Sequence, residues 1–591
     1  MKSGKIMRWT LVLLCMFVTI LPASAQYGRS GSRAVRDRYS RTSTYGDVVE
    51  IRLNEPGTLE QKMTPEMQSS VRLLHIEGPM DYKDFKFIKK LCERSRCEDN
   101  RGKRVDNYID LELEHARIMS SGTGGLLGGH GERDVLGDAL AYASNLRSVL
   151  LPERLKRIDS RALHGCSQLE EVIIPPSVRS IGSSAFSGCS RLEFISLPDG
   201  LERIGDECFN GCGNLKSITI PRSVVEIGDK AFSGSGLKRV KLPYDLEVLG
   251  AKAFENTPLT VLDIPAMTRI TNDDLGTMKK LEEINVENGS RYYLSENGVL
   301  YNADGRVLLL YPAARQGAFV VPDGVEQLAA RSFNGSGVTG IDLPASITAI
   351  GAYAFSGANI THVVLPDGLN ALPTGAFSAC KQLVSVSFPD GMTILSEGAF
   401  EDCSSLRSVD LPHGVSVILP RAFKHCKSMT TVSFPQSLKG IGKEAFEGCA
   451  LTAIDLPPTL ATIGERAFKS CKGLTRVIVP DACLTVGKEA FRECSSLAEV
   501  MLGNGLTTIG DNALRDTPIA SLVLPGTVTQ VGKKVTEKCK NLTRIECHAI
   551  LPPKLDGVSD NKVALYVPAT SIPAYKSAKN WKNFKNILPL E

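Results

Sequence analysis

The sequence has few of the large aromatic side chains on which sugars and bases stack. Only 2 Trp and 14 Tyr occur in 591 residues, which disfavours a binding groove built on rows of rings. The charges nearly cancel, because 69 Lys and Arg stand against 65 Asp and Glu, a net charge of +4. That balance is unlike a dedicated nucleic-acid binder. We therefore expect no nucleic-acid partner, and a glycan partner is disfavoured.

Motifs of catalysis and metal binding are also missing. The 8 His form no H-E-x-x-H or other metal-spaced pair, and no G-x-S-x-G element is present. The glycine-rich stretch 120–133 lacks the G-K-[ST] ending of a phosphate loop. Acidic pairs such as Asp273-Asp274 are expected on surfaces without a cleft. These absences predict a protein that is not an enzyme and has no cofactor or metal.

Long apolar runs are confined to the first segment. A cationic start, the apolar stretch Leu11 to Leu21 and the small residues Ala23-Ser24-Ala25 form the three parts of a secretory signal peptide over 1–25. A lipid anchor at Cys15 is disfavoured because Leu14 is not small. No later segment reaches 18 uninterrupted apolar residues, so the mature chain should have no transmembrane span. We expect export to the cell surface or the extracellular space, with the periplasm as the alternative.

One sequence pattern recurs every 22 or 23 residues. The prolines that end short apolar runs follow this period, as in Pro152, Pro175 and Pro198. The repeat Leu169 to Arg191 reads LEEVIIPPSVRSIGSSAFSGCSR, and the consensus is L-x-x-V/I-x-L/I-P-x-x-V/L-x-x-I-G-x-x-A-F-x-x-C-x-x. About fifteen repeats fit it between residues 135 and 541. A repeat this short cannot bury its apolar face alone, so successive repeats must stack into a β-rich solenoid.

Each consensus position has an expected structural role. The aliphatic residues before Pro175 form a short strand that pairs with the next repeat, and proline ends it because it lacks an N–H. Gly182 should allow a turn that a Cβ would hinder. Phe186 begins a column that holds twelve of the 20 Phe and fills the interior. We expect short strands alternating with turn or 3-10 segments.

Cysteine also forms a column. Ten of the 16 Cys occupy one consensus position: Cys166, Cys189, Cys212, Cys380, Cys403, Cys426, Cys449, Cys471, Cys494 and Cys539. In-register side chains run parallel, whereas a disulfide needs a near-perpendicular dihedral. Buried free thiols are therefore favoured over a disulfide ladder. Cys92 and Cys97 lack redox C-x-x-C spacing, and a local disulfide between them is the favoured interpretation.

The block IPxxVxxIGxxAFxxC closely resembles the BspA-type leucine-rich repeats of bacterial surface proteins. The resemblance covers about 400 residues directly. The stretch 57–118 is similar to the family's N-terminal cap, and CHAILPPKLDGVSDNKVALYVP (547–568) with SIPAYKSAKNWKNFKNI is similar to its C-terminal closing segment. The resemblance implies a leucine-rich-repeat solenoid capped at both ends. It also implies a secreted or cell-surface protein that binds host or bacterial partners.

Breaks in the period divide the chain. After the signal peptide, 26–47 is an Arg- and Ser-rich lead without apolar periodicity. YYLSENGVLYNADGRVLLLYP carries two apolar runs around a turn and predicts an inserted β-hairpin. That insertion could be a partner-binding projection or a tolerated insertion. The expected parts are the cap with a degenerate repeat (48–133), a first array (134–284), the insertion (285–321), a second array (322–541) and the C-terminal cap (542–591).

The third and fifth residues of each strand should face outward on the concave side, alternating with buried ones. These positions define a candidate binding face: Arg239, Lys241, Ser385, Ser387, Ser408, Asp410, Thr431, Ser433 and Asp455. Such residues suit an extracellular protein or cell-surface partner, although they could equally be ordinary solvated strand residues. Adhesion or another protein contact is the first functional hypothesis. A structural, envelope-associated scaffold without a specific host ligand is the alternative.

Overall fold

The structure is a computed structural model that describes residues 48–93, 97–98, 104–105, 108–119, 133–270, 278–557 and 562–590. The expected signal peptide, the Arg- and Ser-rich lead and nearly all of the glycine-rich stretch lie outside the described residues. The described residues form two compact units, which divide between Val224 and Val225. We call them the N-terminal and C-terminal bodies and describe each separately.

Short helices and one antiparallel strand pair precede the regular coils of the N-terminal body. Helix α4 begins in a capping box, in which the Asp81 side chain accepts from the Lys83 N–H and the Asp84 side chain accepts from the Asp81 N–H. Its apolar face buries Phe85, Ile88 and Leu91. The elements are α2 (Leu59–Lys62), α3 (Pro65–Ser70), α4 (Tyr82–Cys92), the antiparallel pair β3 (Cys97–Glu98) and β4 (Arg104–Val105), and the 3-10 turn η2 (Asp138–Leu140).

Two parallel sheets form two sides of the N-terminal body. The first contains β1 (Val48–Arg52), β2 (Leu73–Met80), β5 (Ile109–Glu112), β8 (Leu146–Leu150), β10 (Glu171–Ile173) and β12 (Phe194–Ser196), with β6 (Ala116–Ile118) beside β2. The second contains β7 (Val135–Leu136), β9 (Arg157–Ile158), β11 (Ser180–Ile181) and β13 (Arg203–Ile204). Each coil therefore supplies one longer and one shorter strand.

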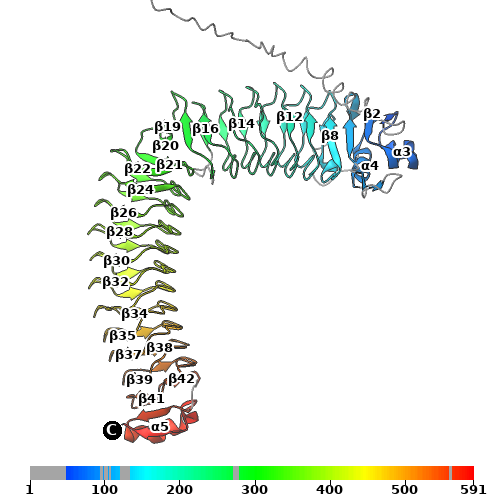
Figure 1. The fold of residues 1–591 in the computed structure, drawn as a ribbon. Helices are drawn as coiled ribbons and strands as arrows, with labels where there is room; N and C mark the ends of the chain where they lie inside the picture. Colours follow the sequence, from blue (N-terminus) through cyan, green and yellow to red (C-terminus); the bar gives the residue numbers. More distant parts are fainter. Residues whose placement is uncertain are drawn as a thin grey trace, which may run out of the picture. The chain divides into compact units, whose positions relative to one another are not determined.

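The same two-strand coil recurs through the C-terminal body, where successive strands lie one after another along the stack (Figure 1). The longer strands are β16 (Val261–Ile264), β18 (Glu283–Val286), β22 (Gly317–Val320), β24 (Val338–Asp342), β26 (His362–Val364), β28 (Ser385–Ser387), β30 (Ser408–Asp410), β32 (Thr431–Ser433), β35 (Arg476–Ile478), β37 (Glu499–Met501), β39 (Ser521–Leu524), β41 (Arg544–Cys547), β43 (Ala564–Val567) and β44 (Ile587–Pro589). All pairs among them are parallel.

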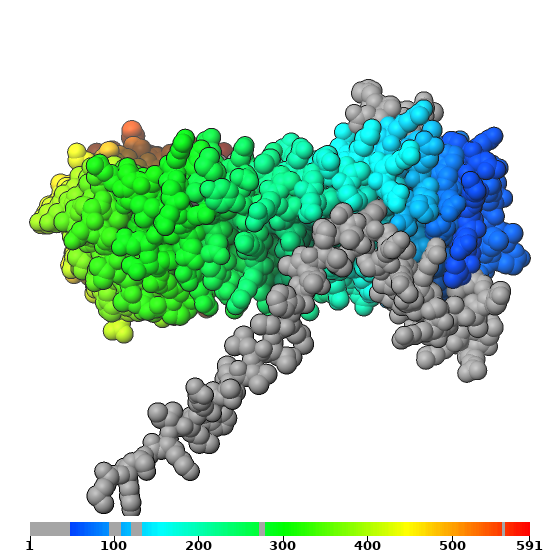
Figure 2. All heavy atoms as spheres, turned by 90° about the horizontal axis from the view of Figure 1, so that it is seen from above, coloured from blue at the N-terminus to red at the C-terminus, as the bar shows by residue number. Residues whose placement is uncertain are grey.

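The shorter strands line a second side of the C-terminal body. They are β14 (Glu226–Ile227), β15 (Val248–Leu249), β17 (Arg269–Ile270), β23 (Gln327–Leu328), β25 (Ala349–Ile350), β27 (Ala371–Leu372), β29 (Ile394–Leu395), β31 (Val417–Ile418), β33 (Gly440–Ile441), β34 (Thr462–Ile463), β36 (Thr485–Val486), β38 (Thr508–Ile509), β40 (Gln530–Val531) and β42 (Lys554–Leu555). The third side of each coil is a run of turns. Within the C-terminal body, the coils coloured green abut as a continuous surface in Figure 2.

The period breaks at three antiparallel strands in the C-terminal body. Strand β20 (Val299–Asn302) pairs antiparallel with both β19 (Tyr293–Glu296) and β21 (Val307–Leu310). The Asn302 side chain accepts from the Val307 N–H across the second turn. Strand β21 then pairs parallel with β23, which restores the solenoid. The segment thus holds two successive hairpins, where the sequence suggested one.

The phenylalanine column forms the spine of the core. Phe377, Phe400 and Phe423 are fully buried, and each ring lies parallel to the next with centroids 5.4 Å apart. The spacing is slightly larger than the strand separation of about 4.8 Å, because in-register strands place equivalent side chains nearly above one another. Tyr311, which directly follows β21, takes the place of a phenylalanine, and its ring centroid lies 5.0 Å from that of Phe333.

The glycine after the buried isoleucine, such as Gly182, was expected to allow a turn. The structure shows that a close contact between coils requires it. A Cβ on Gly182 would lie 2.5 Å from the Ser160 backbone N, and one on Gly464 would lie 2.7 Å from the Gly442 carbonyl carbon. These glycines do not need a left-handed backbone. They let the backbone of one coil contact the backbone of the preceding coil.

The cysteine column consists of buried free thiols. Each of the ten column thiols is buried and outside any disulfide, and each donates to a backbone carbonyl of the preceding coil. For example, the Cys403 Sγ–H donates to the Phe377 carbonyl at 3.1 Å. The predicted disulfide at Cys92 is wrong, because Cys92 is also free and fully buried on α4. The spacing of Cys92 in the sequence could not show that helix α4 turns its thiol into the core.

A charge ladder, made of Arg421, Glu444, Arg466 and Glu489, runs along the turn side of the C-terminal body. Arg466 joins the two carboxylates, with Nη1 3.5 Å from Glu444 Oε1 and Nε 2.8 Å from Glu489 Oε2. Arg421 and Lys424 also reach Glu444, at 3.6 and 2.7 Å. Burial by itself raises the pKa of Glu444, but the hydrogen bond from Lys424 and the surrounding cations lower it overall.

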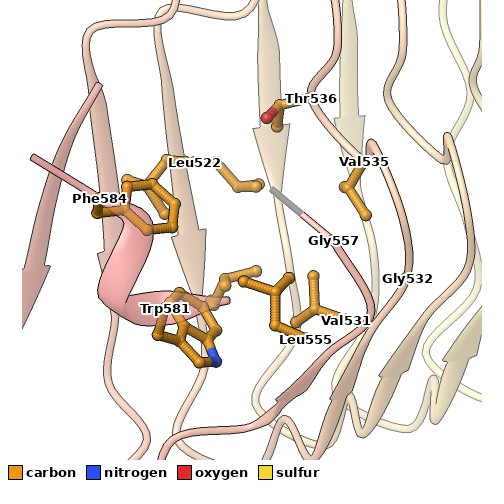
Figure 3. A pocket seen from close by; sticks show the side chains of 11 residues that line it. Leu522, Val531, Gly532, Val535, Thr536, Leu555, Gly557, Trp581 and Phe584 are labelled. Atoms are coloured by element: carbon orange, nitrogen blue, oxygen red, sulfur yellow. The ribbon is translucent and has the colours of Figure 1, made fainter. Parts of the chain in front are cut away.

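The C-terminal cap closes the last coils with a short helix and two 3-10 turns, which are η3 (Ala569–Ser571), α5 (Ile572–Ser577) and η4 (Trp581–Asn583). The Trp581 indole N–H donates to the Pro553 carbonyl at 2.7 Å. Trp581 and Phe584 line one side of an apolar cavity of about 40 Å³ opposite Leu555 (Figure 3). Thr536 also borders the cavity and holds the position that phenylalanine occupies in earlier coils.

Candidate interaction surface

The longer strands of the C-terminal body present two columns of outward side chains. In β28, β30 and β32 the outer two residues are exposed and the middle one is buried. Parallel in-register pairing places Ser408 beside Thr431 and Asp410 beside Ser433. These outer residues hold the third and fifth positions of the repeat, counted from its first leucine, and form two rows along the stack. Successive residues in a row are about 4.8 Å apart. We call this surface the strand face.

All nine residues of the candidate binding face are exposed on the strand face. Seven of them lie on consecutive coils between Ser385 and Asp455, where Ser433 Oγ donates to Asp410 Oδ1 at 2.7 Å. The other two, Arg239 and Lys241, come from a different part of the C-terminal body. The structure thus groups the hydroxyl and acidic residues and leaves the basic pair apart. Whether these residues bind a partner stays a prediction.

The strand face also carries an apolar stripe that the sequence analysis missed. Ile478, Met501 and Val523 take the fifth strand position in three consecutive coils and are 47%, 48% and 42% exposed. Ile478 and Met501 are in-register partners in β35 and β37, and β39 with Val523 contacts β37. The sequence analysis read the fifth repeat position only as far as Asp455. Reading the same position in the next three repeats would have found the stripe.

At the start of the N-terminal body the corresponding outward residues are polar but buried. The His75 Nδ1 lies 3.1 Å from Glu112 Oε2, and Ser148 Oγ donates to Asp110 Oδ1 at 2.6 Å. Arg147 forms an ion pair with Asp110. The hydrogen bond to Glu112 raises the pKa of His75, although burial opposes it. These hydrogen bonds and the ion pair link β2, β5 and β8 across the first coils.

Metal ligation, thiol reactivity and membrane spanning were the remaining properties to compare with the structure. Within them, no group of three or more His, Cys, Asp or Glu is arranged to hold a metal ion. Burial raises the pKa of the Cys380 thiol to about 12, so at neutral pH it is protonated and a poor nucleophile. In the ranges that the structure covers, no helix has the length and apolar character needed to cross a bilayer.

A family model decides what kind of solenoid this is. The model of the BspA type leucine-rich repeat region matches residues 135–260, 202–297, 315–430 and 416–543, which is more than half of the chain. The chain belongs to this family. Leucine-rich-repeat proteins of this kind are typically non-catalytic protein-interaction scaffolds, and the fold expected from the sequence is confirmed.

Solved structures of bacterial leucine-rich-repeat proteins are similar to this BspA-type chain. One from Eubacterium ventriosum is 24% identical, with 56% of this chain and 84% of the other covered and a TM-score of 0.47. One from Bacteroides ovatus is 25% identical, with 69% and 97% covered and a TM-score of 0.41. A leucine-rich cell surface protein from Faecalibacterium prausnitzii is 23% identical, with 60% and 79% covered and a TM-score of 0.32. No curated protein matches the chain significantly.

Proposed function

We propose that this BspA-type protein is secreted or held at the cell surface and binds an extracellular protein or cell-surface partner through its strand face. The observation that carries the proposal is the run of exposed, in-register side chains on consecutive coils, from Ser385 in β28 to Asp455. A periodic surface supports protein binding because strand pairing already fixes the backbone positions that carry its side chains. The family's typical role in protein interaction supports the same conclusion.

Export of the chain is the second part of the proposal. The signal-peptide pattern over 1–25 is the sequence feature behind it. Protease treatment of intact cells tests it: a surface protein is cleaved, whereas a periplasmic protein is protected until the outer envelope is opened.

Binding is tested with the purified chain 26–591 on immobilised extracellular-matrix proteins and on whole cells. We expect saturable binding that falls when Arg239, Lys241, Ser387 and Asp410 are replaced together by alanine. A chain that binds nothing saturably would instead favour the envelope-associated scaffold. Binding that survives the fourfold replacement would remove the polar part of the strand face from the proposal.

A further inference from the structure

The strand face changes character along its length. At the fifth strand position, Asp410, Ser433 and Asp455 are followed on the next coils by Ile478, Met501 and Val523. At about 4.8 Å per coil, the three apolar side chains extend over about 10 Å. Asp455 lies one coil before them, and Asp410 lies three coils before them. β35, β37 and β39, which carry the apolar side chains, follow one another in Figure 1.

Three adjacent exposed apolar residues differ from the isolated ones elsewhere on this face. Val364 takes the same strand position and is 69% exposed, but its in-register partner is Ser387. Single exposed apolar residues are ordinary on protein surfaces. A contiguous set in one column is different, because together it can bury a partner's side chains against a continuous apolar surface.

An ion pair lies beside the apolar stripe, on the same two strands as Ile478 and Met501. Arg476 Nε lies 3.0 Å from Glu499 Oε2, and both side chains are about half exposed, at 53% and 54%. The Arg476 Nη2 also contacts Met501 Sδ at 3.4 Å. These contacts neutralise the charge beside the stripe and hold the Met501 side chain in place. A polar rim around an apolar centre is the usual arrangement of a protein-binding anchor.

The two carboxylates on the coils before the stripe are not neutralised by a cation of the described residues. Asp410 accepts a hydrogen bond from Ser433, and Asp455 is exposed. Among the described residues, neither carboxylate forms an ion pair. At the other end Glu546 is already paired with Arg544 at 2.7 Å. The surface is therefore acidic on one side of the stripe and neutral on the other.

We propose that Ile478, Met501 and Val523 anchor a protein segment that presents two or three apolar side chains followed on one side by lysine or arginine. The apolar side chains cover the stripe, and the cations lie against Asp455 and Asp410. This inference rests on the proposed function, since it names the partner's chemistry for the same strand face. Charge complementarity sets the orientation of the segment, and apolar burial supplies most of the affinity.

The test uses random 12-residue peptides displayed on phage, selected on the full chain 26–591. We expect the enriched peptides to combine apolar residues with lysine or arginine. Synthetic copies should bind at least tenfold more weakly to the double variant Ile478→Thr, Met501→Thr. The variant Asp455→Asn should weaken binding about threefold at low salt and much less in 0.5 M salt, because screening removes the same attraction.

Val364→Thr is the matched control, because it makes a similar change at the same strand position outside the stripe. It should leave peptide affinity unchanged. Enriched peptides that are acidic, or that bind the Ile478 and Met501 double variant as tightly as the original chain, overturn the inference. If such binding is instead lost in the fourfold Arg239, Lys241, Ser387 and Asp410 replacement, the proposed function stands without the stripe. If the chain enriches no peptide, the inference is overturned, while the cell-binding assay still decides the proposed function.

Discussion

At the scale of single residues, the cysteine column shows how closely the repeat is fitted. The thiol of Cys403 reaches the carbonyl of Phe377, as equivalent thiols do in other coils. Where serine replaces cysteine, at Ser235 and Ser336, the hydroxyl is buried and has no hydrogen-bond partner among the described residues. A C–O bond is shorter than a C–S bond, so the hydroxyl does not reach across to the preceding coil.

This difference predicts opposite effects for reciprocal substitutions. Cys403→Ser should lower the free energy of unfolding by about 1–3 kcal/mol, because it buries an unsatisfied hydroxyl. Ser336→Cys should raise it by about 1 kcal/mol, because the thiol can donate where the hydroxyl does not. Urea unfolding followed by circular dichroism measures both. Ser385→Cys on the exposed strand face is the control and should change little; equal losses at 336 and 403 would contradict the explanation.

A second residue-scale feature is the left-handed backbone two residues after the close-contact glycine. Ser184 has φ 57° and Glu444 has φ 57°, and the N–H of each donates to the next coil. Glycine takes the position at Gly375 and Gly398. The conformation is imposed by the hydrogen bond between coils, because non-glycine residues rarely adopt it.

Substitutions at this position should therefore follow backbone strain. Gly398→Ala, at φ 62°, should destabilise by about 1–2 kcal/mol. Ser184→Gly should stabilise by roughly 0.5–1 kcal/mol, since relief of strain exceeds the added freedom of the unfolded chain. Midpoints of urea unfolding test the pair. Changes of the same sign in both variants would show that the backbone conformation is not what matters here.

At the scale of elements, the charge ladder links successive turn segments. The side chains of Glu444 and Glu489 are only 9% and 7% exposed, and cations surround both. Buried carboxylates of this kind contribute to stability while they are ionised, and removing one leaves the neighbouring cations without their partner. The ladder therefore joins coils by charge in addition to the strand hydrogen bonds.

The lowered pKa of Glu444 gives this contribution a defined pH dependence. It is fully present above the ordinary glutamate pKa of about 4.3 and is lost as the pH falls through the lower pKa of the folded state. Glu444→Gln should cost about 1–3 kcal/mol at pH 7, and the difference from the original chain should shrink below about pH 4. Asp402→Asn, in the exposed pair with His425, is the control and should cost under about 0.5 kcal/mol. A difference that stays constant with pH would contradict the role of the ionised carboxylate.

At the scale of the whole molecule, stability should vary along the chain. Each coil contacts its neighbours, so a terminal coil is stabilised from one side and by its cap. The C-terminal cap relies on Trp581, and the cavity beside it shows that packing is less complete there than in the phenylalanine column. We therefore expect this array to unfold in more than one step.

The chain 26–591 contains one tryptophan, Trp581, which makes the prediction measurable. Tryptophan fluorescence should report cap unfolding at a lower urea concentration than circular dichroism reports loss of the strands. Labelling of Cys403, which is fully buried in the middle of the C-terminal body, should follow the later transition. The variant Cys403→Ala identifies its labelling signal by mass. Coincident transitions for all three signals would contradict sequential unfolding.

The sequence by itself determined the solenoid, its period and its buried columns, because a repeated pattern constrains every coil in the same way. It also placed the candidate face outward, since strand residues alternate between the two sides of a sheet. Only the tertiary structure decided the role of Gly182, the free thiol of Cys92 and the partners of Glu444. Each of these depends on which atoms of neighbouring coils meet, and contacts between distant positions are set by stacking and not by local pattern.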